Sequence, residues 1–492
     1  MFLRKKENLI SRKKRTIRLK ERYGYHMKSI WESKQVWTQN KSHGDGTEDV
    51  FSKGMQTKTL VIGAGLTGIL TAYFLAKRGH EVIIVEKDSI TSGQTVRTTA
   101  KITVQHGLIY EKMIRQIGWE KARDYALANE EAIRLYEELI HQEGISCDFE
   151  KLPSYLYTVR DANTEILQRE VQAASSLGIN ARYLIGEELQ DLPFTVKGAV
   201  CFENQAQFHP MKFIRHLTRG LTIYENTHVT KIKGHTIFTN RGEITAEHIV
   251  FATHYPIANI PGFYFLRQHQ ERSYVLAMQT GDSLRGMYYG VDKNGLSLRS
   301  AGDVLLLGGG GHRTGKKMGE ACCKNKGVGY GYLRKMAQIY FPGAEEVAAW
   351  SAQDCMPHDG IPFIGKYSLL RPYWYVATGY KKWGMTSAMI AAVIISNQIC
   401  GEVRIKHINP ALFSPQRILF RASAKDFLKD MGESMWGLLK GWLGGRKHRC
   451  AHMGCRLEWN GEEGSYDCPC HGSRFDFQGR VLDNPSKKNM KK

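Results

Sequence analysis

The chain of 492 residues is long enough for two or three domains, and its 42% hydrophobic and 10% aromatic residues are ordinary for a globular protein. The sequence contains no uninterrupted run of eighteen apolar residues, which excludes an obvious transmembrane helix. The net charge of +21 is uneven: the first 26 residues carry about +8 of it, and the remaining excess is spread too thinly to favour a nucleic-acid-binding protein.

Residues 1–55 are expected to form a basic leader without regular structure. The first 26 residues carry ten Lys and Arg against two Glu, and they lack the apolar core of a secretory signal. Such a run could bind nucleic acid or an anionic membrane surface, but we interpret it as a tail, or as an upstream extension before a working start at Met27. Without an export signal, the sequence predicts a cytoplasmic protein whose clustered cysteines bind metal more often than they form disulfides.

Residues 59–86 have the pattern of a dinucleotide-binding strand, turn and helix. A β-branched strand at 59–62 precedes a glycine-rich turn, and a helix to about Lys77 and a second strand at 82–85 follow. The glycines permit the turn, the approach of a pyrophosphate and close helix packing, and an acid ending the second strand accepts hydrogen bonds from a ribose. The four positions are Gly63, Gly65, Gly68 and Glu86.

A late segment decides which dinucleotide is favoured. A buried strand is expected at 374–377, and Gly379 and Gly384 then precede a helix that begins at Met385. A second helix N-terminus after a glycine turn suits stabilisation of negative charge on a reduced ring. An NAD-only protein gives this segment no role, and FAD is the cofactor implied by the family resemblance described below.

The segments between these two motifs do not have the strand–helix pattern of further Rossmann units. Residues 110–143 predict one long amphipathic helical stretch with a break near Gly118, and residues 272–278 and 303–307 predict strands of a mixed or antiparallel sheet. Flavin oxidation of an amine requires little beyond a positioned C–H bond and a neutral amine, so no catalytic side chain can be assigned. A carboxylate substrate would require an arginine and usually a tyrosine. The candidates by location are Arg272, Tyr274, Arg313 and Tyr380.

Two other motifs are interpreted as structural. The stretch "GGGGHRTGK" nearly matches a P-loop, but Lys317 stands where a magnesium-binding Ser or Thr is required, so a flexible glycine loop near the flavin pocket is expected. Cys355 in "DCMPHDG" could bond a flavin covalently, yet its spacing favours a buried small thiol.

Together these segments resemble the FAD-dependent oxidoreductases of the D-amino-acid oxidase and glycine oxidase class, and most closely bacterial relatives that carry a C-terminal Rieske module. The resemblance implies an α/β fold in which a Rossmann-like FAD domain is interleaved with an α+β substrate domain. It places the FAD-dependent oxidoreductase at 56–422, with an FAD part at about 56–108, 190–260 and 345–402 and a substrate part at about 109–189 and 261–344. The implied FAD-binding residues are Gly63, Gly65, Gly68, Glu86, Thr98, Thr99, Ala100, Lys101, Val229, Gly379, Gly384, Met385 and Thr386.

Residues 423–446 are expected to form an amphipathic linker helix. Its Trp and Leu residues are spaced to share one face. We interpret it as a docking linker, and a helix lying on a membrane surface is the alternative. Peripheral membrane contact is therefore an open expectation.

The stretch "CAHMGCRLEWNGEEGSYDCPCHGSRFD" holds four of the ten cysteines and two histidines. A zinc ribbon usually repeats C-x-x-C on both loops, whereas here each loop offers a cysteine and a histidine close together. Such a set fits a [2Fe–2S] centre in which two histidines hold one iron and two cysteines hold the other, although zinc remains an alternative. The sequence therefore favours an iron–sulfur module at 447–492, reduced to little beyond its ligand loops.

The flanking residues resemble those of Rieske proteins. By that resemblance the iron ligands are Cys450, His452, Cys468 and His471, and Cys455 and Cys470 are the pair that forms a disulfide between the loops in many members. A small β module is implied.

The combined prediction is an FAD-dependent enzyme that oxidises a small amine or amino acid and exchanges electrons with the Rieske cluster. The pairing favours a dehydrogenase with a protein or quinone acceptor over an oxidase, and the reverse electron flow is equally permitted. The alternative is a zinc- or iron-sulfur-sensing regulatory flavoprotein without turnover of a small substrate. Substrate, electron partner and oligomeric state stay open.

Overall fold

The computed structural model describes residues 28–32, 51–281, 283–316, 327–403, 405, 407–419, 428, 432–433, 435–436, 438–439 and 448–490. The predicted leader, 1–55, and the predicted linker helix, 423–446, lie largely outside the described residues. Within the described part of the chain, no helix is long and apolar enough to cross a membrane.

An eight-stranded sheet carries the predicted dinucleotide motif. Its strands are β1 (Phe51–Ile62), β2 (Val82–Val85), β7 (Thr222–Tyr224), β8 (Val229–Lys233), β9 (Thr236–Thr239), β10 (Gly242–Phe251), β16 (Phe363–Ser368) and β17 (Arg371–Thr378). The order is β16-β17-β10-β1-β2-β7, parallel from β17 to β7, with the β8–β9 hairpin attached to β10. Parallel strands are buried on both faces, which explains continuous apolar runs such as Leu60–Ile62.

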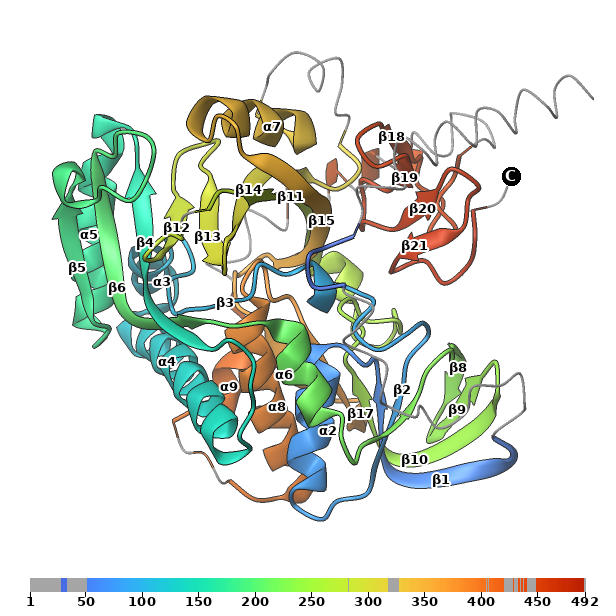
Figure 1. Cartoon of the computed structure of the whole chain (residues 1–492). Helices are drawn as coiled ribbons and strands as arrows, with labels where there is room; N and C mark the ends of the chain where they lie inside the picture. The colour runs from blue at the N-terminus through green and yellow to red at the C-terminus, as the bar shows by residue number, and fades with distance from the viewer. Residues whose placement is uncertain are drawn as a thin grey trace, which may run out of the picture.

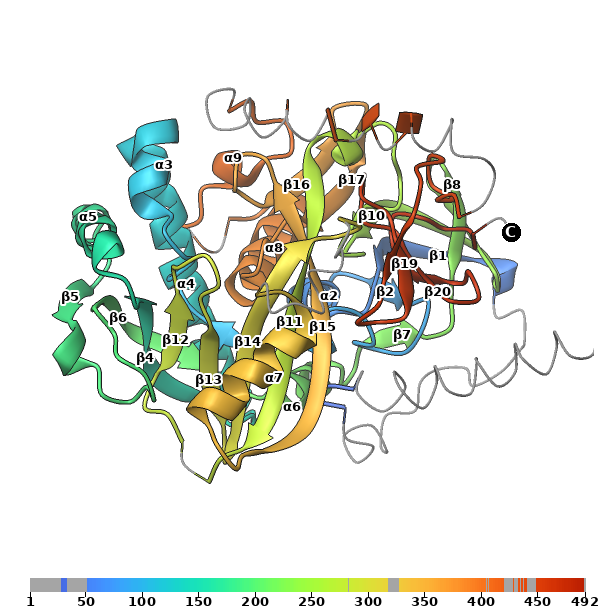
Figure 2. The same cartoon turned by 90° about the horizontal axis from the view of Figure 1, so that it is seen from above.

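Helices cover this sheet and the outer end of the second one (Figures 1 and 2). They are α2 (Leu66–Ala76), α3 (Tyr110–Ile117), α4 (Trp119–Gln142), α5 (Thr164–Ser176), α6 (Pro210–Leu217), α7 (Gly329–Tyr340), α8 (Gly384–Cys400) and α9 (Pro410–Phe413), with short 3-10 turns η2 (Thr95–Arg97), η3 (Asp161–Asn163), η4 (Gly186–Glu188) and η5 (Tyr264–Leu266). The predicted break at Gly118 is confirmed, because α3 and α4 meet there at a φ of +88°. Helix α8 is buried over most of its length between α2 and α4.

A nine-stranded sheet forms the predicted substrate part. Its strands are β3 (Lys101–Ile102), β4 (Glu150–Thr158), β5 (Ala181–Ile185), β6 (Gly198–Gln207), β11 (Gln268–Gln279), β12 (Met287–Gly290), β13 (Ser297–Ala301), β14 (Val304–Arg313) and β15 (Glu345–Pro357). The order is β15-β11-β14-β13-β12-β4-β6-β3, with β5 beside β6, and only β12 and β4 pair in parallel. Strands β3, β6 and β15 belong to this sheet, although their residues fall in the ranges predicted for the FAD part.

The prediction of a glycine loop in "GGGGHRTGK" is wrong. Residues 308–311 lie inside β14: Gly308 pairs with both β11 and β13, Gly309 pairs with β11, and the register with β11 shifts between Gly309 and His312. Glycines are tolerated in this strand because they line a cavity and leave room there.

A third, antiparallel sheet of four strands follows near the C-terminus. It comprises β18 (Glu458–Asn460), β19 (Ser465–Asp467), β20 (Arg474–Asp476) and β21 (Val481–Asp483), in that order. The module lies against the β11 and β15 end of the nine-stranded sheet (Figures 1 and 2). It is therefore a small β domain, and not ligand loops alone.

Candidate functional site

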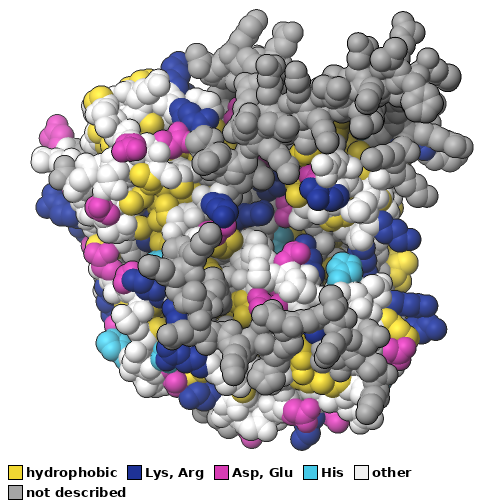
Figure 3. All heavy atoms as spheres, turned by 45° about the vertical axis from the view of Figure 1, so that its right-hand side comes forward, with side chains coloured by type: hydrophobic (Ala, Val, Ile, Leu, Met, Phe, Trp, Pro, Cys, Tyr) yellow, Lys and Arg dark blue, Asp and Glu magenta, His cyan; other side chains and the backbone are white. Residues whose placement is uncertain are grey.

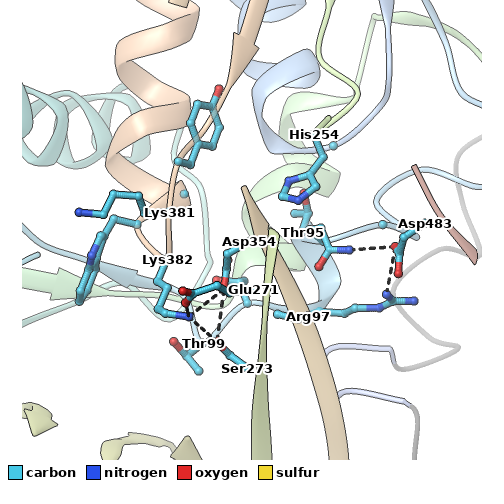
Figure 4. Close-up of a pocket in the computed structure, with 18 of the residues that line it drawn as sticks. Thr95, Arg97, Thr99, His254, Glu271, Ser273, Asp354, Lys381, Lys382 and Asp483 are labelled. Atoms are coloured by element: carbon cyan, nitrogen blue, oxygen red, sulfur yellow. Dashed lines mark hydrogen bonds and ion pairs between the residues drawn. The ribbon is translucent and has the colours of Figure 1, made fainter. Parts of the chain in front are cut away.

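A cavity of about 990 Å³ lies where the three sheets meet. The eight-stranded sheet contributes the turn after β1 and the end of β2, and the nine-stranded sheet contributes β11, β14 and β15. The C-terminal module closes one side with residues 481–484 and Lys487. The cavity thus joins the predicted dinucleotide site, the predicted substrate sheet and the cysteine-rich module (Figure 4).

The glycine turn after β1 fits a dinucleotide. A Cβ at Gly63 would lie 2.5 Å from the Ala252 carbonyl oxygen, and Gly63 has a φ of +109°. A Cβ at Gly68 would lie 1.9 Å from the Gly63 oxygen, so only glycine permits α2 to start this close to the turn. The N-terminus of α2 can then face an anionic pyrophosphate in the cavity.

Glu86 is held at the end of β2 by backbone donors. Ala64 N donates to Oε2 at 2.8 Å and Asp88 N donates to Oε1 at 3.1 Å. Burial raises the pKa of Glu86, and these two hydrogen bonds act in the opposite direction. The carboxylate is therefore positioned at the cavity wall, where a ribose would meet it.

Most of the predicted FAD-binding residues line this cavity. Thirteen were predicted, and nine are in its wall: Gly63, Gly65, Glu86, Thr98, Thr99, Lys101, Val229, Gly384 and Met385. The other four, Gly68, Ala100, Gly379 and Thr386, are not among the lining residues. Burial beside Arg299 lowers the pKa of Lys101 to about 7, and its ammonium group donates to Tyr288 O and Ser297 Oγ.

The four candidate substrate-binding residues separate into two groups. Tyr380 lines the cavity, and its hydroxyl lies 3.0 Å from Thr67 Oγ1. Tyr274 is also in the wall, but its hydroxyl lies 2.9 Å from His312 Nε2. Arg272 and Arg313 do not line the cavity, and their guanidinium groups pair with Glu463 and Glu433. Neither arginine therefore stands where a substrate carboxylate would bind.

Sequence reasoning missed a charged group on the substrate wall. Glu271 and Ser273 of β11, Asp354 of β15 and Lys382 after β17 all line the cavity and contact one another (Figure 4). The run of polar residues at 268–273 in β11 was the available signal, but the pairing of β11 with β15, some eighty residues later, was needed to bring the acids together.

The predicted iron ligands converge in the C-terminal module. Cys450 and Cys468 are buried free thiols, and the rings of His452 and His471 lie 5.1 Å apart. The Nδ1 atoms of both histidines are buried and have no hydrogen-bond partner. Buried polar atoms normally have partners, so these two thiols and two orphaned nitrogens fit a cluster held by two Cys and two His.

Cys455 and Cys470 form a disulfide between the two loops. The sulfur atoms of Cys455, Cys468 and Cys470 also gather within 4.8 Å, as in a metal site. Because two of these three are joined to each other, Cys468 is the one left to bind a metal. The arrangement matches the division of the cysteines that the resemblance implied.

The edge of the C-terminal module that carries His452 and His471 faces the loop before β11. His452 Nε2 lies within 2.9–3.1 Å of the Asn259 side-chain amide, and the Phe265 ring lies edge-to-face to His471 at 5.7 Å. His471 is buried. The two cluster loops are therefore seated on the loop before β11.

A buried ionic group joins the module to the nine-stranded sheet. Arg272 Nε donates to Glu463 Oε2 at 3.0 Å, and Arg474 binds Glu463, Asp467 and Asp483 at 2.8–3.0 Å. Burial would raise the pKa of Glu463, but the charges of Arg272 and Arg474 outweigh it and lower the pKa to about 2. Asp483 also accepts from Gln94 in the cavity wall at 3.2 Å.

Cys355 is fully buried, with its Sγ 3.4 Å from His254 Nε2. Burial raises the pKa of this thiol well above its ordinary value. A thiol held protonated is a weak nucleophile, in agreement with the expectation of a structural residue.

The fold and the two sites together define an FAD-dependent oxidoreductase with an iron–sulfur module. A model of the FAD dependent oxidoreductase family matches residues 58–398, and the chain belongs to this family. A model of the Rieske [2Fe-2S] domain matches residues 436–492. The chain thus combines an FAD-binding domain with a Rieske domain that binds a [2Fe–2S] cluster.

Some similar proteins match nearly the whole chain, and others match only its oxidoreductase part. A Bacillus subtilis (strain 168) protein named "Putative Rieske 2Fe-2S iron-sulfur protein YhfW" is 33% identical over 485 residues, which cover 88% of this chain and 92% of that protein. Glycine oxidase from Geobacillus kaustophilus superimposes with a TM-score of 0.62 at 20% identity over 74% of this chain and 99% of its own. L-proline dehydrogenase from P. horikoshii gives 0.61 at 18% identity, over 74% and 98%. These two structures show the fold.

Proposed function

We propose that this chain oxidises a small amine or amino acid in the cavity and exchanges the electrons with its Rieske cluster. When bound, FAD supplies two-electron chemistry and the [2Fe–2S] cluster supplies one-electron chemistry. The proposed FAD contacts are the nine lining residues above, together with the backbone glycine Gly68. The proposed iron ligands are Cys450, His452, Cys468 and His471.

One observation carries the proposal: the paired strands β11 and β15 separate the two sites by the thickness of a single sheet. Side chains alternate between the two faces of a strand. Glu271, Ser273, Ala352 and Asp354 line the cavity, whereas Gln270, Arg272, Ser351 and Gln353 contact the module. Further along β11 the alternation ends, because Tyr274 and Val275 both line the cavity. Two redox sites on opposite faces of one strand pair are suitably placed to exchange electrons.

Two glutamines support this interpretation by fixing the second ligand loop. Gln270 Nε2 donates to the His471 carbonyl at 2.7 Å, and Gln353 Nε2 donates to the Gly472 carbonyl at 2.8 Å. The backbone N–H of Gln353 donates to Gln94, which lines the cavity. Few hydrogen bonds therefore separate the cavity wall from a ligand of the proposed cluster.

We propose a dehydrogenase in preference to an oxidase, with a protein or quinone as the external partner. Electron transfer through a cluster is not needed if oxygen accepts the electrons directly in the cavity. The division into an oxidoreductase at 56–422, a linker at 423–446 and a Rieske module at 447–492 is part of the same proposal.

An anaerobic screen tests the activity. Small amines and amino acids are added to the FAD- and iron-loaded chain without oxygen, and loss of flavin absorbance identifies substrates. We expect turnover with an added quinone or ferricyanide to exceed turnover with oxygen alone. If no amine or amino acid bleaches the flavin, the proposed function is wrong, and faster turnover with oxygen would contradict the dehydrogenase.

A further inference from the structure

Two acids face each other across the β11–β15 pair inside the cavity. Glu271 stands directly opposite Asp354 in the register of the antiparallel ladder. Like charges at directly opposed positions destabilise a sheet. The opposed carboxylates therefore require a positive charge or a proton to offset their repulsion.

Lys382 occupies the space between the two acids. Its ammonium nitrogen lies 3.4 Å from Glu271 Oε2 and 3.5 Å from Asp354 Oδ2, and it donates to Ser273 Oγ at 2.8 Å. The Ser273 hydroxyl donates in turn to Asp354 Oδ2 at 3.3 Å. Two carboxylates share one lysine, so the group keeps one negative charge in excess when all three are ionised.

The group is open to the cavity. The side chains of Lys382, Glu271 and Asp354 keep 27%, 30% and 18% of their exposure, and all three are lining residues. The neighbouring glycines of β14, 308–311, leave free volume beside them. A ligand in the cavity can therefore reach the two acids.

The same wall is poorly suited to a carboxylate. Arg97 is the single arginine among the described lining residues, and it lies near Asp483 at 3.8 Å, beside the C-terminal module. Lys101 is committed to Tyr288 and Ser297, and Lys381 extends away from the acid pair in Figure 4. Bidentate recognition of a substrate carboxylate has no described partner here.

We propose that Glu271 and Asp354 bind the ammonium group of a cationic amine that lacks a neighbouring carboxylate, at the place where Lys382 now stands. This inference rests on the proposed function and narrows its substrate class from amines and amino acids to alkylamines and diamines. Asp354 then accepts one proton from the ammonium nitrogen, which leaves a neutral amine with a free electron pair. No other bond changes in this step.

The surroundings of Asp354 suit that proton transfer. Burial raises its pKa, the charge of Lys382 opposes this shift, and the charge of Glu271 adds to it. Glu271 differs, because the contacts with His269 and Lys382 outweigh burial and lower its pKa to about 2. One acid therefore stays ionised to hold the cation while the other is the more basic. The groups that interact with the pair are His269 and Ser273 of β11, Tyr289 of β12, Lys382 and, through its charge, Lys381.

Equilibrium binding to the oxidised, FAD-loaded chain tests the site. Butylamine and 2-aminobutyrate are titrated under anaerobic conditions, and affinity is measured by calorimetry and by the change in flavin absorbance. We expect butylamine to bind more tightly. Glu271→Gln should weaken butylamine roughly tenfold or more, the loss expected when a charge-assisted hydrogen bond is removed, and Asp354→Asn should do the same. Lys382→Met should strengthen butylamine, because it removes the cation that competes for the acids.

Glu243→Gln, at an exposed position of β10, is the matched control and should leave the affinity unchanged. Both acid-to-amide changes keep the shape of the side chain and remove a repulsion, and FAD content verifies folding. Tighter binding of 2-aminobutyrate, or an affinity for butylamine that Glu271→Gln does not alter, would overturn the proposal. Amino acids that bleach the flavin when amines do not would refute this site and leave the proposed function standing. Amines that bind at this site, when neither amines nor amino acids bleach the flavin, would refute the function and leave the site.

Discussion

The guanidinium group of Arg272 is fully buried, yet it lies on the side of β11 that faces away from the cavity. Its partner Glu463 belongs to the Rieske domain and is shared with Arg474. A buried charge that loses its partner is left without solvation, which makes such pairs sensitive to the removal of one member. Arg272 therefore serves to anchor the Rieske domain.

Glu463→Gln should destabilise the Rieske domain. Removal of this carboxylate leaves two buried guanidinium groups short of a counter-charge, and the free energy of unfolding should fall by roughly 3 kcal/mol or more. Urea unfolding followed by the visible absorbance of the cluster measures it. Glu462→Gln, the half-buried neighbour, is the control and should change little. Equal effects of the two substitutions would show that the buried pair has no special role.

The same carboxylate predicts a pH dependence. The pKa of Glu463 is lowered to about 2 in the folded chain, against about 4.3 for an unfolded glutamate. A lowered folded pKa stabilises the fold above the unfolded value, and this contribution disappears as the pH falls toward 2. The difference in stability between the natural chain and Glu463→Gln should therefore shrink from about pH 6 to about pH 3. A constant difference over this range would contradict the assignment.

At the scale of structural elements, the turn after β14 and the second ligand loop are in close contact. A Cβ at Gly315 would lie 2.3 Å from Pro469 N and 2.4 Å from the Cys468 carbonyl carbon. A Cβ at Gly472 would lie 2.6 Å from Gln270 Cβ. The nine-stranded sheet thus supports the backbone that carries the proposed ligands Cys468 and His471.

Gly315→Ala should displace the second ligand loop and lower the iron content while FAD content stays normal. Gly302→Ala is a matched control, because Gly302 has a φ of +63° against +72° at Gly315, and its Cβ would meet nothing within 4 Å. Iron and FAD per chain are measured for both purified variants. If the two variants retain the same iron, the contact does not position the loop.

The elements that could be predicted from the sequence are those whose signal is local. The β-branched run at 59–62, the glycine turn and the break at Gly118 each depend on neighbouring residues, and each was found in the structure. The glycines 308–311 indicated a loop in the sequence, because glycine is unfavourable in the interior of a strand. The neighbouring strands and the cavity, which explain these glycines in β14, become visible only in the structure. The acid pair Glu271 and Asp354 depends on which strands pair and in which register, and a single sequence does not contain this information directly.

At the scale of the whole molecule, three sheets meet around one cavity, and the Rieske domain is part of its wall. On the face in Figure 3, basic side chains are interspersed with acidic ones over the described surface and form no continuous basic area. The described residues of this face therefore do not form a basic surface of the kind that binds nucleic acid. This internal arrangement is the basis of the proposed electron exchange between the two domains.

The most direct test of that exchange is an EPR spectrum of the chain after anaerobic addition of an identified substrate, with no other reductant. The account predicts the signal of a reduced His-ligated [2Fe–2S] cluster, of the kind that dithionite also produces, and its loss in Cys468→Ser. A flavin that bleaches completely while the cluster stays oxidised at every time after mixing would contradict it.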